Sequence, residues 1–273
     1  MSMVLRILVS SPHELPFLRL NILESMRKVD RILVCEADFT HTGQIRGFIF
    51  DQLIKELSEG ERAKVEYLPM KLGHLIDWNR KDGDLYHHIE QLIRNQFTEE
   101  TTIGEKDIVV AVDADEIIYE ETYDLIRKKL NSKFVIHPKS LRLKLNQFFY
   151  RLDYHWFNCS FTSPVAANAR YFLEKGKTAQ WRDEGKVLSA FAGCHYSWIM
   201  DIEQMVRKLE TYAHNDIYGK YANKELLEDA IKNREYPFDR TVNFKINKIE
   251  RSSLLYPNHF REVFDDNHTW FSN

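Results

Sequence analysis

The chain has 273 residues, of which 44% are hydrophobic and 29% charged, as is typical of a globular protein and not of a disordered one. It contains 38 Lys and Arg residues and 41 Asp and Glu residues, and the formal net charge of −3 argues against binding nucleic acid or an anionic membrane through overall charge. The three cysteines stand far apart without C-x-x-C spacing and predict no disulfide framework.

The sequence also gives no sign of a membrane anchor. A spanning helix needs roughly 20 consecutive apolar residues, and no stretch approaches that length. The N-terminal sequence MSMVLRILVSSPHE has only a short apolar run and lacks a cleavage site of small residues. We therefore expect a soluble cytoplasmic protein without an anchor.

The first 130 residues alternate between short apolar runs, which predict strands, and segments with apolar residues at helical spacing, which predict helices. In chain order we expect a strand at 4–10, a helix at 14–29, a strand at 31–37, a helix at 47–60 closed by Gly60, a strand at 64–69, a helix at 84–97, a strand at 107–115 and a helix at 120–130. This alternation predicts an α/β fold with a mostly parallel central sheet and helices on both faces.

After residue 130 the pattern changes. The sequence KFVIHPKSLRLKLNQFFYRLDYHWF (133–157) combines period-two alternation with aromatic residues, which predicts longer, partly antiparallel strands. We expect helices at 201–215 and 224–233. Because no Pro-, Gly- or Ser-rich linker divides the chain, we predict a single domain over 1–273, made of the halves 1–130 and 131–273.

Residues 109–118, VVAVDADEII, place three carboxylates at the end of an apolar run. In an open parallel sheet, ligands bind beyond the carboxyl ends of the strands. Asp113 and Asp115 are two residues apart and are expected on one strand face, where they could bind a divalent cation that bridges substrate phosphates. The alternative is a solvated acidic turn with Glu116 at the start of a helix.

This segment resembles the aspartate motif of glycosyltransferase family 17, the family that includes the bisecting N-acetylglucosaminyltransferase of N-glycan processing. The sequence ILVCEADFTHTGQIRGFIF (32–50) is similar to the family's V-x-E-S-N-F-T-x-x-G segment, with Ala37 and Asp38 in place of Ser-Asn. Without an anchor, the chain resembles a bacterial or viral type of member.

Three further segments bear on this resemblance. The sequence FAGCHYSWI (191–199) is similar to the family's A-G-W-H-x-S-W segment, with Cys194 in place of Trp. The sequence YPNHFREVF (256–264) is similar to the closing L-P-x-y-i stretch. The family's N-terminal N-D-E-L-D-L-L-E pattern is only partly present, as SPHELPFLRLN (11–21), which leaves the contacts of the first loop open.

The resemblance implies a GT-A-like, Rossmann-like nucleotide-diphosphosugar transferase fold. It also implies a glycosyltransferase of the hexosyltransferase type, which moves a sugar from a nucleotide-diphosphosugar to an acceptor hydroxyl with inversion, using Mn²⁺ or Mg²⁺. A UDP-sugar is the expected donor, with N-acetylglucosamine as the family default. A bacterial or viral glycan, a lipid-linked sugar, a protein or a modified nucleic-acid base remains open as the acceptor.

The resemblance and the sheet-edge argument together predict the site residues. The predicted metal ligands are Asp113, Asp115 and His195. The predicted contacts to the nucleotide-sugar are Glu36, Thr40, Gly43, Arg80, Arg94, Asp113 and Arg182. Asp183 and Glu116 are the predicted catalytic residues, and Trp198 is the predicted acceptor contact.

The general base is nominated by position. Inverting displacement needs a base on the face of the sugar opposite the diphosphate. Asp183 lies in the polar segment WRDEGK, directly before the His195 segment, and its alternatives in the second half are Asp153, Glu184 and Asp201. Two other functions also stay open: a nucleotidyltransferase that uses the same acids and releases pyrophosphate, and a non-catalytic glycan-binding module of the same fold.

Overall fold

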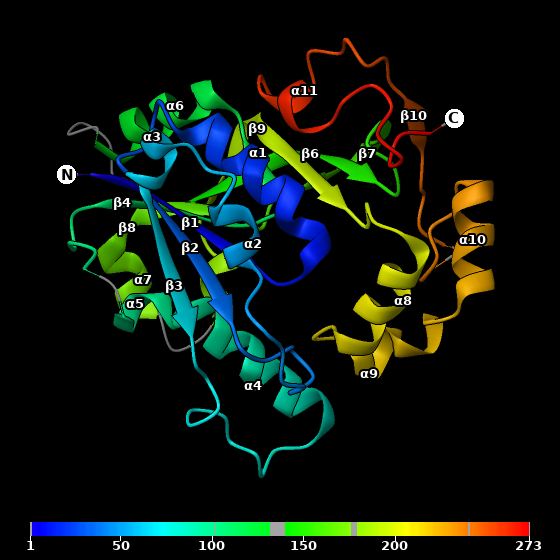
Figure 1. The fold of residues 1–273 in the computed structure, drawn as a ribbon, viewed down its shortest axis with the longest axis horizontal. Coiled ribbons are helices and arrows are strands. Elements are labelled where there is room, and N and C mark those ends of the chain that lie inside the picture. Colours follow the sequence, from blue (N-terminus) through cyan, green and yellow to red (C-terminus); the bar gives the residue numbers. More distant parts are fainter. Residues whose placement is uncertain (1, 101, 132–139, 176–178, 240, 273) are drawn as a thin grey trace.

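The computed structural model describes residues 2–272 apart from 101, 132–139, 176–178 and 240 (Figure 1). Within these residues ten strands form one sheet, in the order β10-β7-β6-β8-β4-β1-β2-β3, with β9 beside β6 and β5 beside β9. The strands are β1 (Met3–Val9), β2 (Arg31–Ala37), β3 (Val65–Met70), β4 (Ile108–Asp113), β5 (Glu116–Ile118), β6 (Ser140–Phe149), β7 (Tyr154–Phe161), β8 (Val165–Asn168), β9 (Lys186–Ser197) and β10 (Ile246–Lys248).

The helices cover both faces of this sheet and extend to one side of it (Figure 1). They are α1 (Leu15–Ser25), α2 (Phe50–Ile54), α3 (Glu59–Arg62), α4 (Asp82–Asn95), α5 (Phe97–Glu100), α6 (Glu120–Asn131), α7 (Ala169–Lys175), α8 (Ile202–Thr211), α9 (Asn215–Tyr218), α10 (Lys224–Asn233) and α11 (Phe260–Val263). No helix of the described residues is long and apolar enough to cross a membrane.

The first half forms the parallel part of the sheet, as the apolar runs predict. Strands β1, β2, β3 and β4 pair in parallel, and all seven residues of β1 are buried. Alternate residues of β1 face opposite layers. Leu5 and Ile7 pack in the cluster that contains Leu18 of α1, whereas Val4 packs in the cluster that contains Ile93 of α4. These strands therefore end together at one edge, between two helical layers.

Three predicted helices differ from the observed ones. The helix predicted at 201–215 ends at Thr211, and α9 begins only at Asn215. The helix predicted at 47–60 is two short helices, α2 and α3, because Ser58 caps a new helix in a reciprocal arrangement with Glu61. Gly60 accordingly lies inside α3 and closes nothing. The helix predicted from residue 14 begins at Leu15, after a 3-10 turn at Pro12–Glu14. The predicted strand region 133–139 lies outside the described residues.

The strand predicted at 107–115 is also too long, and this changes the site. Strand β4 ends at Asp113, where its backbone N–H donates to Glu116 Oε2 at 2.7 Å. The backbone N–H of Ala114 donates to the carbonyl of Leu8 at 2.8 Å, and the chain then enters β5. Asp115 therefore lies in a turn, so it does not share a strand face with Asp113, and Glu116 begins a strand and not a helix.

The second half is antiparallel except where β6 runs parallel to β9. Each of these strands is directly followed by an aromatic residue with a left-handed backbone, Tyr150 with φ 68° after β6 and Trp198 with φ 58° after β9. Such a conformation is strained for a bulky side chain and persists only where packing enforces it. After Trp198 the chain turns into α8, which lies across from α4 in Figure 1.

Candidate active site

A cleft of about 1250 Å³ opens beyond the carboxyl ends of β1, β2 and β4. The loops after β1 and β2 and helix α4 form one side, and the ends of β6, β7 and β9 together with α8 form the other. The predicted site residues that line the cleft are Thr40, Arg94, Asp113, Asp115, Glu116, Arg182, Asp183, His195 and Trp198. Glu36, Gly43 and Arg80 lie outside its lining. The cleft therefore unites most of the predicted residues.

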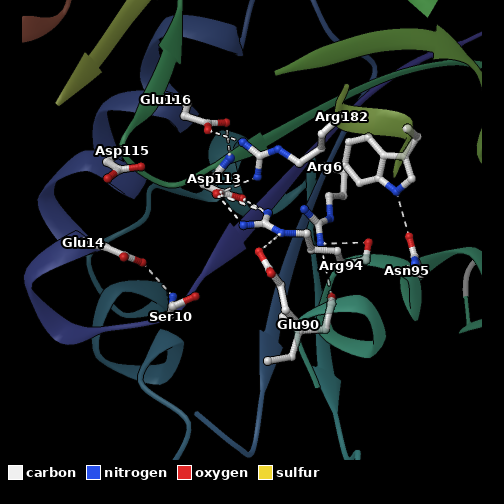
Figure 2. A network of polar contacts seen from close by, with 12 residues as sticks. Arg6, Ser10, Glu14, Glu90, Arg94, Asn95, Asp113, Asp115, Glu116 and Arg182 are labelled. Carbon is white, nitrogen blue, oxygen red and sulfur yellow. Dashed lines mark hydrogen bonds and ion pairs between the residues drawn. The ribbon is translucent and has the colours of Figure 1, made fainter. Parts of the chain in front are cut away.

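Asp113 lies between two guanidinium groups (Figure 2). Arg94 Nη1 contacts Asp113 Oδ1 at 2.8 Å, and Arg182 Nη1 contacts Asp113 Oδ2 at 2.9 Å. Arg182 Nη2 also donates to Glu116 Oε1 at 2.6 Å, and Arg94 Nε donates to Glu90 Oε1 at 3.0 Å. Burial raises the pKa of Asp113, but the charges of Arg182 and Arg94 outweigh it and hold the pKa well below the usual range.

A third arginine, Arg6, supports this cluster by holding the end of α4. Arg6 of β1 is fully buried, and its Nη2 donates to the carbonyls of Ile93 and Arg94 at the end of α4, both at 3.3 Å. Its guanidinium lies over the ring of Phe97 at 5.2 Å. Arg6, Arg94 and Arg182 together match the charges of Glu90, Asp113 and Glu116. We call these six residues the arginine cluster; it has no net charge when all six are ionised.

Asp115 stands outside this cluster and belongs to a different group of contacts (Figure 2). Its Oδ2 lies 3.7 Å from Nε2 of His195, which β9 brings opposite the β4–β5 turn. Burial raises the pKa of Asp115, but His195 outweighs that effect and the carboxylate stays ionised. On the other side of the imidazole, Nδ1 lies 2.9 Å from Gln147 Oε1, and the ring of Phe161 packs at 3.9 Å.

These contacts decide which residues could hold a divalent cation. Among the described residues, no three His, Cys, Asp or Glu side chains converge as a metal site. Both oxygens of Asp113 are engaged by arginines. Nδ1 of His195 is bonded to Gln147 Oε1, so Nε2 is the ring nitrogen turned toward Asp115, and in the neutral ring it would offer its lone pair to a cation, as in many metal-ligating histidines. Asp115 and His195 thus fit a cation that takes its other ligands from phosphate and water.

The structure gives Glu36 a place in the core. It is fully buried, and its carboxylate accepts hydrogen bonds from Arg46, Tyr67 and the backbone N–H groups of Ile49 and Phe50. These bonds fix the chain segment that follows β2 and includes Thr40 and Gly43. In this structure Glu36 holds that segment, and its predicted contact with the nucleotide stays a prediction.

The other predicted residues are spread over the segment after β2 and the rim of the cleft. Thr40 Oγ1 accepts from the backbone N–H of Gln44 at 3.1 Å. Gly43 has φ 81°, and a Cβ there would lie 3.2 Å from the ring of Trp78, so packing and backbone both favour glycine. Arg80 pairs with Asp77 at 3.3 Å on the surface, away from the cleft.

The predicted base lies at the rim. Asp183 is exposed and lines the cleft, and its side chain makes no hydrogen bond or ion pair within the described parts of the chain. Among its alternatives, Asp153 is buried and bound to Ser272, and Asp201 caps the N-terminus of α8. Asp183 is thus free to meet an acceptor, whereas Asp153 serves the packing of the C-terminal segment.

Several cleft residues were missed from the sequence. The loop after β1 contributes His13 and Glu14, whose carboxylate accepts from the backbone N–H of Ser10 at 2.7 Å. Burial raises the pKa of Glu14 to about 7 and lowers the pKa of His13 to about 3. Helix α8 contributes Arg207 and Lys208. The position of SPHE directly after a buried strand was the available signal for the first loop.

The profile of glycosyltransferase family 17 matches residues 3–239 of this chain. The chain therefore belongs to glycosyltransferase family 17. The enzyme class and the GT-A-like α/β fold predicted from the sequence are confirmed, and this glycosyltransferase carries its polar cleft at the sheet edge where the fold places ligands.

Two solved structures resemble this glycosyltransferase at low identity. A 4-diphosphocytidyl-2C-methyl-D-erythritol synthase has 11% identity and a TM-score of 0.40, covering 77% of this chain and 99% of its own. An apo structure of the bifunctional glycosyltransferase WbbM has 12% identity and a TM-score of 0.37, covering 67% of this chain and 34% of its own. None of the curated proteins matches the sequence.

Proposed function

We propose that this glycosyltransferase moves a sugar from a nucleotide-diphosphosugar to an acceptor hydroxyl, with inversion and with a divalent cation. The observation that carries the proposal is the pairing of Asp115 with His195 at the carboxyl edge of the sheet, beside the arginine cluster. Membership of the family supports sugar transfer. The metal, the inversion and the donor are the parts that we propose.

Asp115 and His195 are the residues that would hold Mn²⁺ or Mg²⁺. A bound cation would offset the charge that develops on the departing diphosphate. The protein holds both ligand side chains in position for the cation. The hydrogen bond from Nδ1–H to Gln147 fixes the tautomer of His195, and the ring of Phe161 fixes its plane.

The remaining residues of the site bind the substrates or position other side chains. Arg94 and Arg182 turn guanidinium N–H groups toward the cleft but are charge-matched by their carboxylates, so they supply hydrogen-bond donors and little net charge. Glu116 ties Arg182 to the β4–β5 turn and thereby positions Asp115. We keep Asp183 as the nominated base, which takes the proton of the acceptor hydroxyl at the rim.

The size of the cleft agrees with two substrates. Pockets for one small ligand usually measure about 300–1,000 Å³, and this cleft measures about 1250 Å³. A nucleotide-sugar near the segment that contains Thr40 leaves room for part of an acceptor near Trp198. We propose a UDP-sugar, with N-acetylglucosamine as the first sugar to test.

A screen of nucleotide-sugars tests this function. The protein is heated with each of a set of UDP-, GDP- and dTDP-sugars, with and without Mn²⁺. A true donor at a hundredfold excess over its dissociation constant should raise the free energy of unfolding by about 2.7 kcal/mol, in a Mn²⁺-dependent way. Release of a nucleoside diphosphate supports transfer, whereas pyrophosphate would indicate a nucleotidyltransferase. Stabilisation by no nucleotide-sugar contradicts the proposal.

A further inference from the structure

The cleft is lined by five Lys and Arg side chains and seven Asp and Glu side chains, and the surroundings of the five cations differ. The cationic Lys and Arg side chains that line it are Arg46, Arg94, Arg182, Arg207 and Lys208. Arg46 pairs with the buried Glu36, and the next two belong to the arginine cluster. Neither Arg207 nor Lys208 forms an ion pair within the described residues. The two lining cations without an ion-pair partner among the described residues therefore both come from α8.

Binding a diphosphate at this edge of the sheet requires positive charge in the cleft. The arginine cluster is neutral when ionised, and Asp115 adds a negative charge to the same edge of the sheet. A donor that brings a diphosphate to this edge meets like charge unless cations offset it. One divalent ion offsets part of this charge, and a cation without an ion-pair partner on the other side of the cleft can offset the rest.

Lys208 is better placed for this than Arg207. Gln204, Lys208 and Thr211 are spaced at i, i+4 and i+7 on α8 and all line the cleft, whereas Arg207 is more exposed. Lys208 also acts on the opposite wall. After burial, its charge is the next largest influence that lowers the pKa of His13, and it also lowers the pKa of Glu14 and of Asp115.

Trp198 holds the lysine in place. The ammonium of Lys208 lies 5.3 Å from the centre of the Trp198 ring, and Phe238 packs against the same indole at 5.0 Å. The left-handed backbone of Trp198 turns the chain from β9 into α8 and so brings this helix back over the ring. A cation–π contact contributes about 0.5–2 kcal/mol, less than a charge-assisted bond to phosphate, so the ammonium is free to move to a diphosphate.

We propose that Lys208 binds the diphosphate of the donor and stabilises it as it leaves, and that Trp198 positions Lys208. This rests on the proposed function. In the transfer, the bond from the anomeric carbon to the diphosphate breaks and its electron pair stays on the phosphate oxygen. The acceptor oxygen bonds to the anomeric carbon, and its proton goes to the base. Lys208 moves no proton and offsets the new negative charge.

The test compares two lysines in the same kind of contact. Lys220 lies 5.1 Å from the ring of Tyr221, outside the lining of the cleft, so K220M is the matched control. Calorimetry with UDP and Mn²⁺ should show affinity about 10- to 100-fold weaker in K208M, as expected for a lost charged hydrogen bond. K208R should recover most of that affinity, and K220M should equal the wild type. The salt dependence of UDP affinity should be shallower in K208M alone.

Turnover separates the two roles. With the donor identified by the screen, K208M should lower kcat and raise the donor KM without changing the acceptor KM. W198F should weaken UDP binding less than K208M does, because a smaller ring still faces the ammonium. Equal UDP affinity in K208M and K220M overturns the inference while leaving the proposed function intact. A change confined to the acceptor KM also overturns it. A wild type that binds none of UDP, GDP and dTDP in the presence of Mn²⁺ contradicts the proposed function, and this inference with it.

Discussion

Asp113 and Asp115 are separated by one alanine and have opposite surroundings. Asp113 ends β4 and is held by two guanidinium groups, inside a cluster whose six charges match. Asp115 lies in the turn, faces His195, and has Lys208 as its unmatched cation across the cleft. A D-x-D sequence at a strand end therefore need not place both acids on one ligand. The first acid here is bound by two arginines in the lining of the cleft, and we propose that the second faces the substrate.

The difference follows from where the strand stops. If β4 continued to residue 115, the two side chains would share a face. The carboxylate of Glu116 instead accepts the backbone N–H of Asp113, and Ala114 bonds to β1, so the chain turns between the two acids. Substitutions of either acid or of its neighbours test whether the surroundings of Asp113 and of Asp115 act independently.

The largest expected effect is on turnover in D115N. Asparagine is nearly isosteric, so the fold should persist, but the negative ligand for the cation is lost. We expect a loss of about 10²- to 10³-fold in kcat, the size typical of removing one transition-state stabiliser. Mn²⁺-dependent UDP binding, measured by calorimetry, should weaken in parallel. A variant with wild-type turnover would show that Asp115 is not at the reacting end of the cleft.

In D113N we expect the main effect on the free energy of unfolding, whereas in D115N it is on turnover. Removing one charge leaves Arg94 and Arg182 without their shared partner, and breaking a buried ion pair usually costs about 3–5 kcal/mol. The Asp113 side chain is 26% exposed, so we discount this to roughly 2–3 kcal/mol of the free energy of unfolding. Urea unfolding followed by tryptophan fluorescence measures it, with D115N as the control that should change little. Equal destabilisation in both variants would break the contrast.

A smaller effect is expected at Gln147. Q147L removes the acceptor for Nδ1–H of His195 and frees the ring to change tautomer. Loss of such a supporting bond typically weakens metal affinity by about 10- to 100-fold. Q147E keeps an acceptor at the same position and should bind Mn²⁺ at least as well as the wild type. If Mn²⁺ titrations of Q147L and the wild type coincide, His195 is not a ligand.

The smallest net effect is expected on the pH dependence of stability, because the titrations of His13 and Glu14 change the free energy of unfolding in opposite directions. The pKa of His13 is lowered to about 3, so the folded state binds fewer protons and stability rises with pH up to about 6.5. The pKa of Glu14 is raised to about 7, so stability falls as pH rises from about 4.5 to 7. Both effects overlap between about pH 4.5 and 6.5 and should nearly cancel there in the wild type.

Replacing either residue alone should reveal the pH dependence of stability that the other residue causes. Urea unfolding of H13N should show stability falling with rising pH across that window, because Glu14 alone remains. E14Q should show stability rising, because His13 alone remains. Parallel profiles in both variants and the wild type would mean that neither group titrates as its burial requires.

Much of the fold was readable from the sequence because the first half follows simple periodicities. The strand expected at 31–37 is β2 residue for residue, and the edge of the sheet that carries the acids was located correctly. The break in the helix expected at 47–60 was also readable, since Ser58 and Glu61 have the spacing of a capping box.

The site was less predictable because its contacts join distant segments. The partners of Asp113 come from α4 and from residue 182, 69 positions further along the chain. The position of Glu36 at a strand end did not reveal its bonds to the 37–50 segment, which folds back over it, and its contact with the nucleotide stays a prediction. Lys208 lies on an ordinary amphipathic helix, and only the left-handed turn at Trp198 aims that helix at the cleft. No periodicity encodes such a turn.

A crystal grown with Mn²⁺ and UDP, analysed by anomalous scattering from manganese, tests the account most directly. We predict one manganese peak bonded to Asp115 and to Nε2 of His195 at about 2.0–2.2 Å, by analogy with zinc bonds to the same ligand atoms, with Asp113 still held by Arg94 and Arg182. The ammonium of Lys208 should have left Trp198 for the diphosphate. Manganese bonded to Asp113, or UDP bound in the cleft with no manganese peak beside Asp115, would contradict it.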